Sequence, residues 1–113
     1  MSYVPPTAAD VLAYLGAGTT ATVDEIGPVL LAEIELQGSF VRFPVQDDPD
    51  VAEPYPASLA EALKRRVARA LAARGIPLGI IPSMGDAGGT SYLSAFDSET
   101  RRLEARYRRR PVG

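Results

Sequence analysis

The sequence predicts an all-α fold, a small bundle of about four helices with a long Gly-rich loop before the last one. Three observations support this prediction. Apolar residues recur at helical spacing in several segments. Hydroxyl residues followed three positions later by an acid mark helix starts. Glycine and proline then punctuate the segment ends. The 113 residues are enough for one domain with a modest core.

The first helix is expected from the stretch TAADVLAYLG. Thr7 and Asp10 have the capping-box spacing, in which each side chain accepts from the other residue's backbone amide. The apolar run that follows ends at Gly16, a residue type that commonly terminates helices.

The second helix is expected over about residues 23–41, after a capping box formed by Thr22 and Glu25. Its apolar residues fall at helical spacing: Val23, Ile26, Leu30, Ile34 and Val41. Because a proline removes one backbone hydrogen bond, Gly27-Pro28 predicts a kink or a late start at Pro28.

The third helix is expected from Ser58 to Arg74, with Ser58 and Glu61 as a third capping box. Its apolar stripe consists of Leu59, Leu63, Val67 and Leu71. Its cationic residues are placed on the other faces: Lys64, Arg65, Arg66, Arg69 and Arg74. Gly75 and Pro77 end this helix.

Two stretches are not helical in pattern. Residues 41–57 predict an extended acidic loop with four prolines. Residues 75–95 hold five glycines and permit a loose β-hairpin. This second loop is too apolar for a simple linker, and we expect it to order against a neighbouring subunit. The residues expected at that contact are Leu78, Ile80, Ile81, Met84, Tyr92 and Leu93.

The last helix is expected to begin near Ser94 or Asp97 and to reach about Arg108, with Phe96, Leu103 and Tyr107 on one side. The predicted organisation is therefore one domain: a helical core over residues 1–74, the loop, and a docking helix and tail over residues 96–113.

The composition argues against catalysis. The chain has no cysteine and no histidine, which removes disulfides, thiolate chemistry, the Ser-His triad and the commonest metal ligands. The turn MGDAGGTS lacks the Gly-Lys-Ser/Thr ending of a phosphate-binding loop. The acids of residues 47–53 are interpreted as solvated rather than as a cation site. We therefore expect no enzyme activity, no cofactor and no metal.

No apolar run approaches the length that spans a bilayer, so no membrane association is expected. The first residues, MSYVPPTAAD, lack the basic and apolar regions of a signal peptide. The protein is expected to be made and assembled in the cytoplasm.

Charge is unevenly distributed along the chain. Residues 1–56 carry nine acids and one base, a net of −8, whereas residues 57–113 carry five acids and eleven bases, a net of +6. Separate solvated faces are the simpler interpretation from charge alone. Head-to-tail packing of identical subunits, acidic patch against basic patch, would use the same polarity.

Residues 96–113, named here the arginine segment, hold six arginines in ten positions. They could bind nucleic acid, form a solvated face or dock on a protein. The segment's net charge is only +3, and Glu99 and Glu104 can pair with Arg102 and Arg108 at helical spacing. Protein docking is therefore favoured, and a small nucleic-acid-binding regulator is the alternative. The residues expected to dock are Phe96, Arg101, Arg102, Leu103, Tyr107, Arg108, Arg109 and Arg110.

The order of these elements resembles a known family. A short helix after a proline, VPPTAADVLAYLG, precedes a long helix, an acidic loop, the helix LAEALKRRVARALAARGIPLG and the ending DSETRRLEARYRR. This layout resembles the head-to-tail adaptor (connector, or head-completion) proteins of long-tailed bacteriophages over nearly the whole chain. The residues of the ending that match the family's terminal motif are Asp97, Glu99, Arg101, Arg102, Leu103, Glu104, Tyr107, Arg108 and Arg109. Gly27-Pro28 departs from the unbroken second helix expected of the family.

The resemblance implies a structural virion protein at the head-tail junction. Such adaptors form a ring, commonly a dodecamer, beneath the portal, where they extend the DNA channel. The implied partners are the portal protein, a stopper or tail-completion protein and other copies of the chain, with packaged DNA nearby. Under this interpretation, deleting residues 96–113 is expected to abolish portal docking while the helical bundle stays folded.

Overall fold

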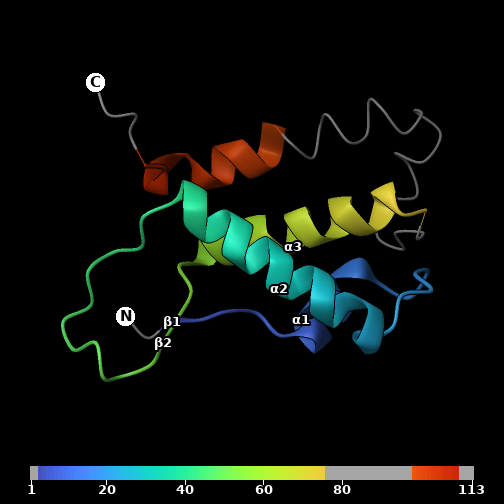
Figure 1. The fold of residues 1–113 in the computed structure, drawn as a ribbon, viewed down its shortest axis with the longest axis horizontal. Helices are drawn as coiled ribbons and strands as arrows, with labels where there is room; N and C mark the ends of the chain where they lie inside the picture. Colours follow the sequence, from blue (N-terminus) through green and yellow to red (C-terminus); the bar gives the residue numbers. More distant parts are fainter. Residues whose placement is uncertain (1–2, 76–97, 110–113) are drawn as a thin grey trace.

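The computed structural model describes residues 3–75 and 98–109, which form a small, mostly helical bundle (Figure 1). The elements are β1 (Tyr3–Val4), α1 (Ala8–Leu15), α2 (Val23–Phe40), β2 (Glu53–Pro54), α3 (Ala57–Ala73) and the 3₁₀-helix η2 (Ala105–Tyr107). Residues 98–104 are α-helical and lead directly into η2, so residues 98–107 are named here the terminal helix. The predicted helical bundle is confirmed, whereas residues 76–95 of the predicted hairpin loop lie outside the described residues.

Both of the first two helices begin with the predicted capping boxes. In α1, Thr7 Oγ1 accepts from the Asp10 amide at 3.1 Å, and Asp10 Oδ2 accepts from the Thr7 amide at 2.9 Å. In α2, the corresponding distances between Thr22 and Glu25 are 3.2 and 3.0 Å. Gly16 ends α1 with a φ of 84°, a conformation that glycine adopts without the steric cost of a Cβ.

The predicted late start of the second helix at Pro28 is wrong. Helix α2 begins at Val23, directly after its Thr22 cap, and contains Pro28 in its interior. The hydrogen bond that proline cannot make would reach the carbonyl of Asp24, an exposed residue in the first turn. Water can satisfy that carbonyl, so the proline does not displace the helix start.

The predicted Ser58–Glu61 capping box is also wrong. Helix α3 begins at Ala57 after Pro56, and no side chain caps its first turn. Pro56 has a φ of −49° and a ψ of 137°, the extended conformation of an N-cap residue, and its carbonyl accepts from the Ala60 amide at 3.0 Å. Ser58 therefore lies inside the first turn rather than before it.

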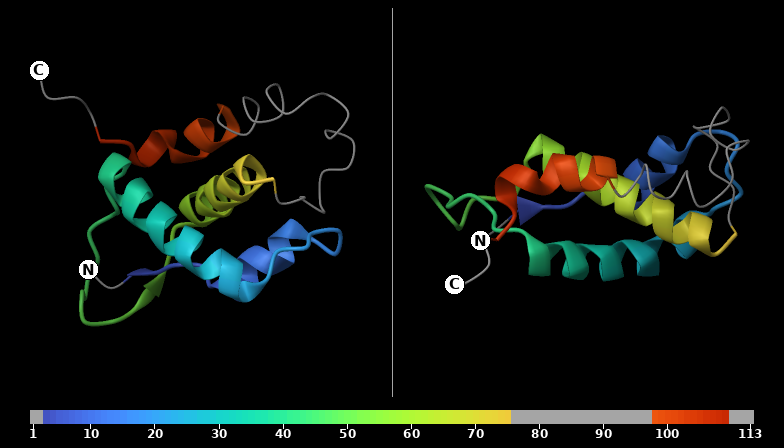
Figure 2. Two further views of the ribbon diagram at one scale, coloured as in Figure 1. Left: turned by 45° about the vertical axis from the view of Figure 1, so that its right-hand side comes forward. Right: turned by 90° about the horizontal axis from the view of Figure 1, so that it is seen from above.

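The core lies where α1, α2 and α3 meet. Its large buried side chains are Val11, Leu15, Ile26, Val29, Leu30, Leu63, Val67 and Leu71. Burial of each such side chain contributes about 2 kcal/mol to folding. The stripe predicted on the third helix is buried throughout its length. Helix α1 and the terminal helix lie on opposite sides of the α2–α3 pair (Figures 1 and 2).

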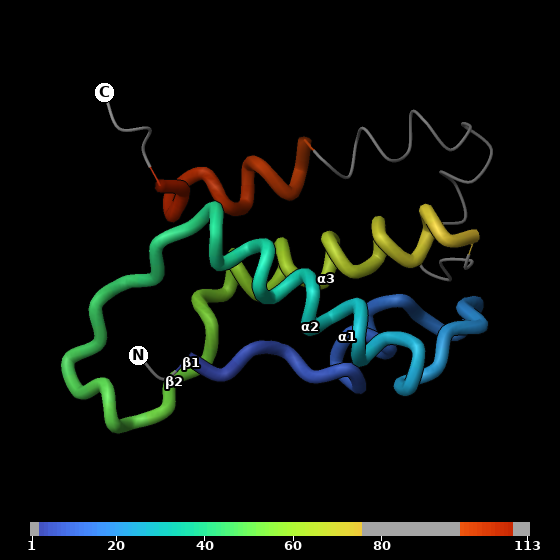
Figure 3. Tube along the Cα trace, in the orientation of Figure 1, coloured from blue at the N-terminus to red at the C-terminus, as the bar shows by residue number. Residues whose placement is uncertain are grey.

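A short parallel strand pair closes the loop that follows α2. Strand β1 pairs with β2 in the register Tyr3 to Glu53 and Val4 to Pro54. Phe43 lies between two tyrosine rings, 5.1 Å from Tyr3 and 4.9 Å from Tyr55 between centroids. The acidic loop therefore projects from a fixed base (Figure 3). The sequence did not predict this pairing, because two-residue strands leave no alternating pattern.

Within the described residues, none of the helices has the length and apolar character to cross a membrane.

Candidate docking surface

The terminal helix is fixed to the bundle by a buried carboxylate. Glu104 has no exposed surface and accepts two hydrogen bonds from Arg66, Nε to Oε2 and Nη2 to Oε1, both at 2.7 Å. The buried Gln37 amide donates to Glu104 Oε2 at 2.9 Å and to the Leu59 carbonyl at 3.1 Å. A buried charge is tolerated only when it is paired and hydrogen-bonded, so these contacts hold the helix in place.

Main-chain hydrogen bonds add a second attachment at the end of the terminal helix. The Arg42 amide donates to the Tyr107 carbonyl at 2.7 Å, and the Arg109 amide donates to the Phe40 carbonyl at 2.9 Å. These bonds form an isolated antiparallel bridge centred on Arg108. The chain after α2 and the chain after η2 are therefore joined side by side.

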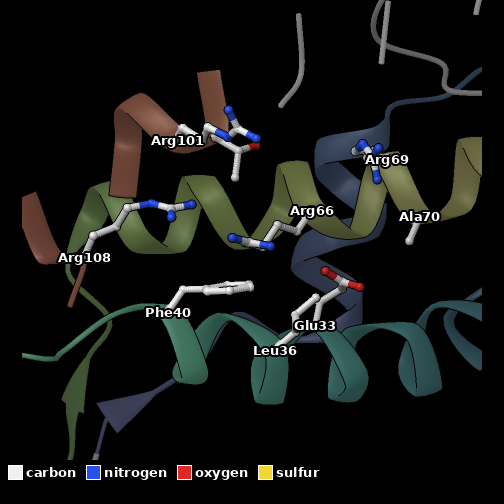
Figure 4. Close-up of a pocket in the computed structure, with 9 residues that line it drawn as sticks. Glu33, Leu36, Phe40, Arg66, Arg69, Ala70, Arg101 and Arg108 are labelled. Atoms are coloured by element: carbon white, nitrogen blue, oxygen red, sulfur yellow. The ribbon is translucent and has the colours of Figure 1, made fainter. Parts of the chain in front are cut away.

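Phe40 lies close to two guanidinium groups. The Arg66 and Arg108 guanidinium carbons are 5.3 and 5.5 Å from the centre of its ring (Figure 4). Both distances fall within cation–π range. Arg108 Nη2 is also 3.5 Å from Glu104 Oε1. The aromatic ring and the carboxylate thus hold both arginines at this end of α2.

These residues border a groove between α2, α3 and the terminal helix, with a volume of about 620 Å³. Its lining, drawn in Figure 4, consists of Glu33, Leu36, Phe40, Arg66, Arg69, Ala70, Thr100, Arg101 and Arg108. We name it the arginine groove. The described lining holds four arginines and the Glu33 carboxylate, and two of the arginines, Arg66 and Arg108, also pair with Glu104. The apolar lining side chains come from α2 and α3. The groove can therefore bind an acidic segment that also carries apolar side chains.

Among the described residues that line the groove, Glu33 is the one acid. Burial raises the pKa of Glu33, and the positive charges of Arg66, Arg69 and Arg74 act in the opposite direction. Its carboxylate therefore offsets only part of the positive charge around it.

The terminal helix also has an outward side. Arg102 is exposed there and donates from Nε to Glu99 Oε2 at 3.1 Å. This hydrogen bond lowers the pKa of Glu99. Arg106 and Arg109 are exposed as well, and the Arg106 guanidinium lies 5.7 Å from the Tyr107 ring. The pairings predicted for Glu99 with Arg102 and for Glu104 with Arg108 are both present.

Within the described part of the chain, the predicted docking residues separate into three groups. Arg101 and Arg108 line the arginine groove, whereas Arg102 and Arg109 lie exposed outside it. Leu103 and Tyr107 are half-buried, but the fully packed side of the terminal helix is formed by Thr100 and Glu104. Phe96, Arg110 and all six loop residues from Leu78 to Leu93 lie outside the described residues.

Sequence reasoning missed the α2 and α3 residues of the groove and misplaced Arg66. It placed Arg66 on a face other than that of the apolar stripe, yet the Arg66 side chain is only 13% exposed and pairs with Glu104. The spacing of Arg66 and Gln37 from the apolar residues of their helices could have indicated their burial. Arg66 follows Leu59 by seven residues, and Gln37 follows Leu30 by seven, so both occupy core positions of apolar stripes. Polar residues at core positions indicate a buried polar network.

Comparison with known proteins found no match to this chain among family models, curated proteins or solved structures. Among residues 3–75 and 98–109, no three acidic side chains are grouped closely enough to hold a metal ion.

Proposed function

We propose that this chain is a structural virion protein without catalytic activity. It assembles as a ring, commonly a dodecamer in the proteins that it resembles, beneath the portal at the head-tail junction. There it extends the DNA channel and offers a platform for a stopper or tail-completion protein. The resemblance in the order of elements and in the ending DSETRRLEARYRR motivates this proposal.

The attachment of the terminal helix to the bundle is the structural observation that best supports this proposal. Because Glu104 and the bridge at Arg108 fix this helix to the bundle, its outward arginines are presented on a rigid frame. A preorganised surface binds with a smaller loss of conformational entropy than a flexible tail does. The exposed Arg106 and Arg109 are the residues that we assign to an acidic surface on the portal.

Electron microscopy of purified portal rings from the virus that encodes the chain tests this assignment. Adding the protein should produce an extra ring of density below the portal. The double variant Arg106→Glu/Arg109→Glu should lose that density, because it reverses two exposed charges without removing a main-chain bond. Arg42→Glu, which reverses an exposed arginine outside the terminal helix, is the matched control. Normal docking of the double variant would refute the assignment.

The alternative function, a nucleic-acid-binding regulator that uses the same arginines, is separated by salt dependence. Phosphate contacts release counterions, so a regulator loses affinity for duplex DNA steeply as salt rises. An adaptor should show little salt-sensitive affinity for a DNA duplex while it still binds portal rings.

A further inference from the structure

We infer that the arginine groove receives residues 44–52, the central part of the acidic loop, of a second copy of this chain. In the groove, Arg69 of α3 and Arg101 of the terminal helix lie across from Leu36 and Phe40 of α2 (Figure 4). Both of these apolar side chains are substantially exposed, at 43% and 40%. A fitting ligand therefore carries several negative charges and at least one apolar side chain.

Residues 44–52 have this composition. Asp47, Asp48 and Asp50 are exposed, and the loop carries no base. Val45 and Val51 lie on either side of the three acids and are 92% and 54% exposed. The loop therefore presents two apolar side chains beside a cluster of negative charge, which complements the groove in both respects.

The loop is also held in a defined shape. The Val51 amide donates to the Asp48 carbonyl at 3.1 Å, and the Asp50 amide donates to Asp48 Oδ1 at 3.0 Å. The Gln46 side chain donates to the Val51 carbonyl at 3.2 Å. These contacts fix the tip, while the β1–β2 pair fixes the base. A preordered loop loses little conformational entropy on docking.

Docking must occur between copies. The loop projects beyond the helices at one end of the molecule (Figures 1 and 3). The groove, by contrast, is lined by residues of α2, α3 and the terminal helix. Within the described part of the chain, the groove lining includes no residue of 44–52. The contact joins two different surfaces, so it is head-to-tail and repeats from copy to copy, closing into a ring when the rotation allows. Only the closed ring rests on the proposed function; the pairwise contact does not.

Disulfide trapping tests the contact. The chain has no native cysteine, so only the introduced cysteines can form a disulfide. A chain with Val45→Cys is mixed with a chain carrying Leu36→Cys under mild oxidation. A disulfide requires the two Cβ atoms to come within about 4 Å, so trapping reports direct contact. We expect the mixed dimer to form about ten-fold faster than with a Leu31→Cys partner, because docking raises the effective thiol concentration. Leu31 is 69% exposed on α2 and does not line the groove, so it is the matched control.

Charge reversal within this pair tests the electrostatics. Asp47→Arg/Asp50→Arg in the loop partner, or Arg69→Glu/Arg101→Glu in the groove partner, should each slow trapping about ten-fold. The two reversed partners together should trap at nearly the original rate, since attraction is restored. Denaturant unfolding of each variant checks that it folds. Equal rates with the Leu36→Cys and Leu31→Cys partners, an unreactive thiol at position 36, or no recovery in the reversed pair would each overturn the inference.

The two proposals fail separately. Arg106→Glu/Arg109→Glu should leave loop–groove trapping unchanged while it abolishes portal docking. If trapping fails but wild-type protein still docks on portal rings, the inference is wrong and the proposed function stands. If trapping succeeds but portal rings gain no density, the proposed function is wrong and the contact between copies stands.

Discussion

Arg66 of α3 and Glu104 of the terminal helix are 38 residues apart in the sequence, yet they form a two-bonded ion pair with both distances at 2.7 Å. This pair makes the terminal helix part of the bundle rather than an appendage. It also supplies one of the cationic side chains of the arginine groove, so the contact that stabilises the fold and the surface proposed for docking share a residue.

Glu104→Gln is expected to lower the free energy of unfolding by about 3 kcal/mol, because it leaves Arg66 as a largely buried cation without its charged partner. Urea denaturation followed by circular dichroism measures the change. Glu99→Gln is the matched control: it removes the exposed pair with Arg102, and exposed pairs contribute little. Equal losses for the two variants would show that the burial of Glu104 is not the cause.

A double-mutant cycle separates pairing from burial. Arg66→Met and Glu104→Leu should each be strongly destabilising, because each leaves one buried charge behind. The combined variant should recover most of that loss, with a coupling energy of about 2 kcal/mol or more, since apolar pairs commonly replace buried ion pairs without net cost. Denaturant titration of all four proteins provides the values. Additive losses would mean that the two side chains act independently.

Deleting residues 98–113 is expected to destabilise the bundle, whereas the sequence led us to expect a folded bundle after deletion of residues 96–113. The deletion removes Glu104 from Arg66 and Gln37, and it removes the main-chain partners of Arg42 and Phe40. We expect a loss of about 3 kcal/mol or more in the free energy of unfolding. A truncated chain with the stability of the full chain would contradict this.

The sequence predicted the elements that follow from local periodicity. Helices α1 and α2 begin at their hydroxyl caps, and the Leu59-to-Leu71 stripe is buried, because caps and apolar spacing act within a few residues. The start of α3 was misjudged because Ser58 and Pro56 are both possible residues before a helix. Pro56 is the one that precedes α3, so Ser58 lies inside the first turn.

Most of the candidate site was beyond sequence reasoning. The arginine groove joins residues of α2, α3 and the terminal helix, which meet only through tertiary packing. Arg101 and Arg108 were identified because arginine is dense in that segment. Phe40 and Arg69 come from helices whose polar faces look solvated in isolation, and no local pattern shows which surfaces face one another.

Removing a helix cap separates the correct capping assignments from the wrong one. Thr7→Ala and Thr22→Ala should each lower the free energy of unfolding by about 1 kcal/mol, because each leaves a first-turn amide without its acceptor. Ser58→Ala is the control and should have almost no effect, since no side chain caps α3. Thermal or urea unfolding measures all three. A loss for Ser58→Ala equal to the other two would reinstate the capping box predicted from the sequence.

Glu33 predicts a specific dependence of stability on pH. Burial raises the pKa of Glu33 in the folded protein above its unfolded value, with nearby arginines opposing the shift. A carboxyl group with a raised pKa favours folding while it is protonated, and this contribution is lost as pH rises through the folded pKa. Glu33→Gln should therefore be more stable than wild type at neutral pH, and the difference should shrink toward about pH 4. Urea titrations at the two pH values test this, with the exposed Glu35→Gln of the same helix as the control. A Glu33→Gln protein that is less stable than wild type at neutral pH, with the gap closing on acidification, would show that the arginines, rather than burial, dominate at Glu33.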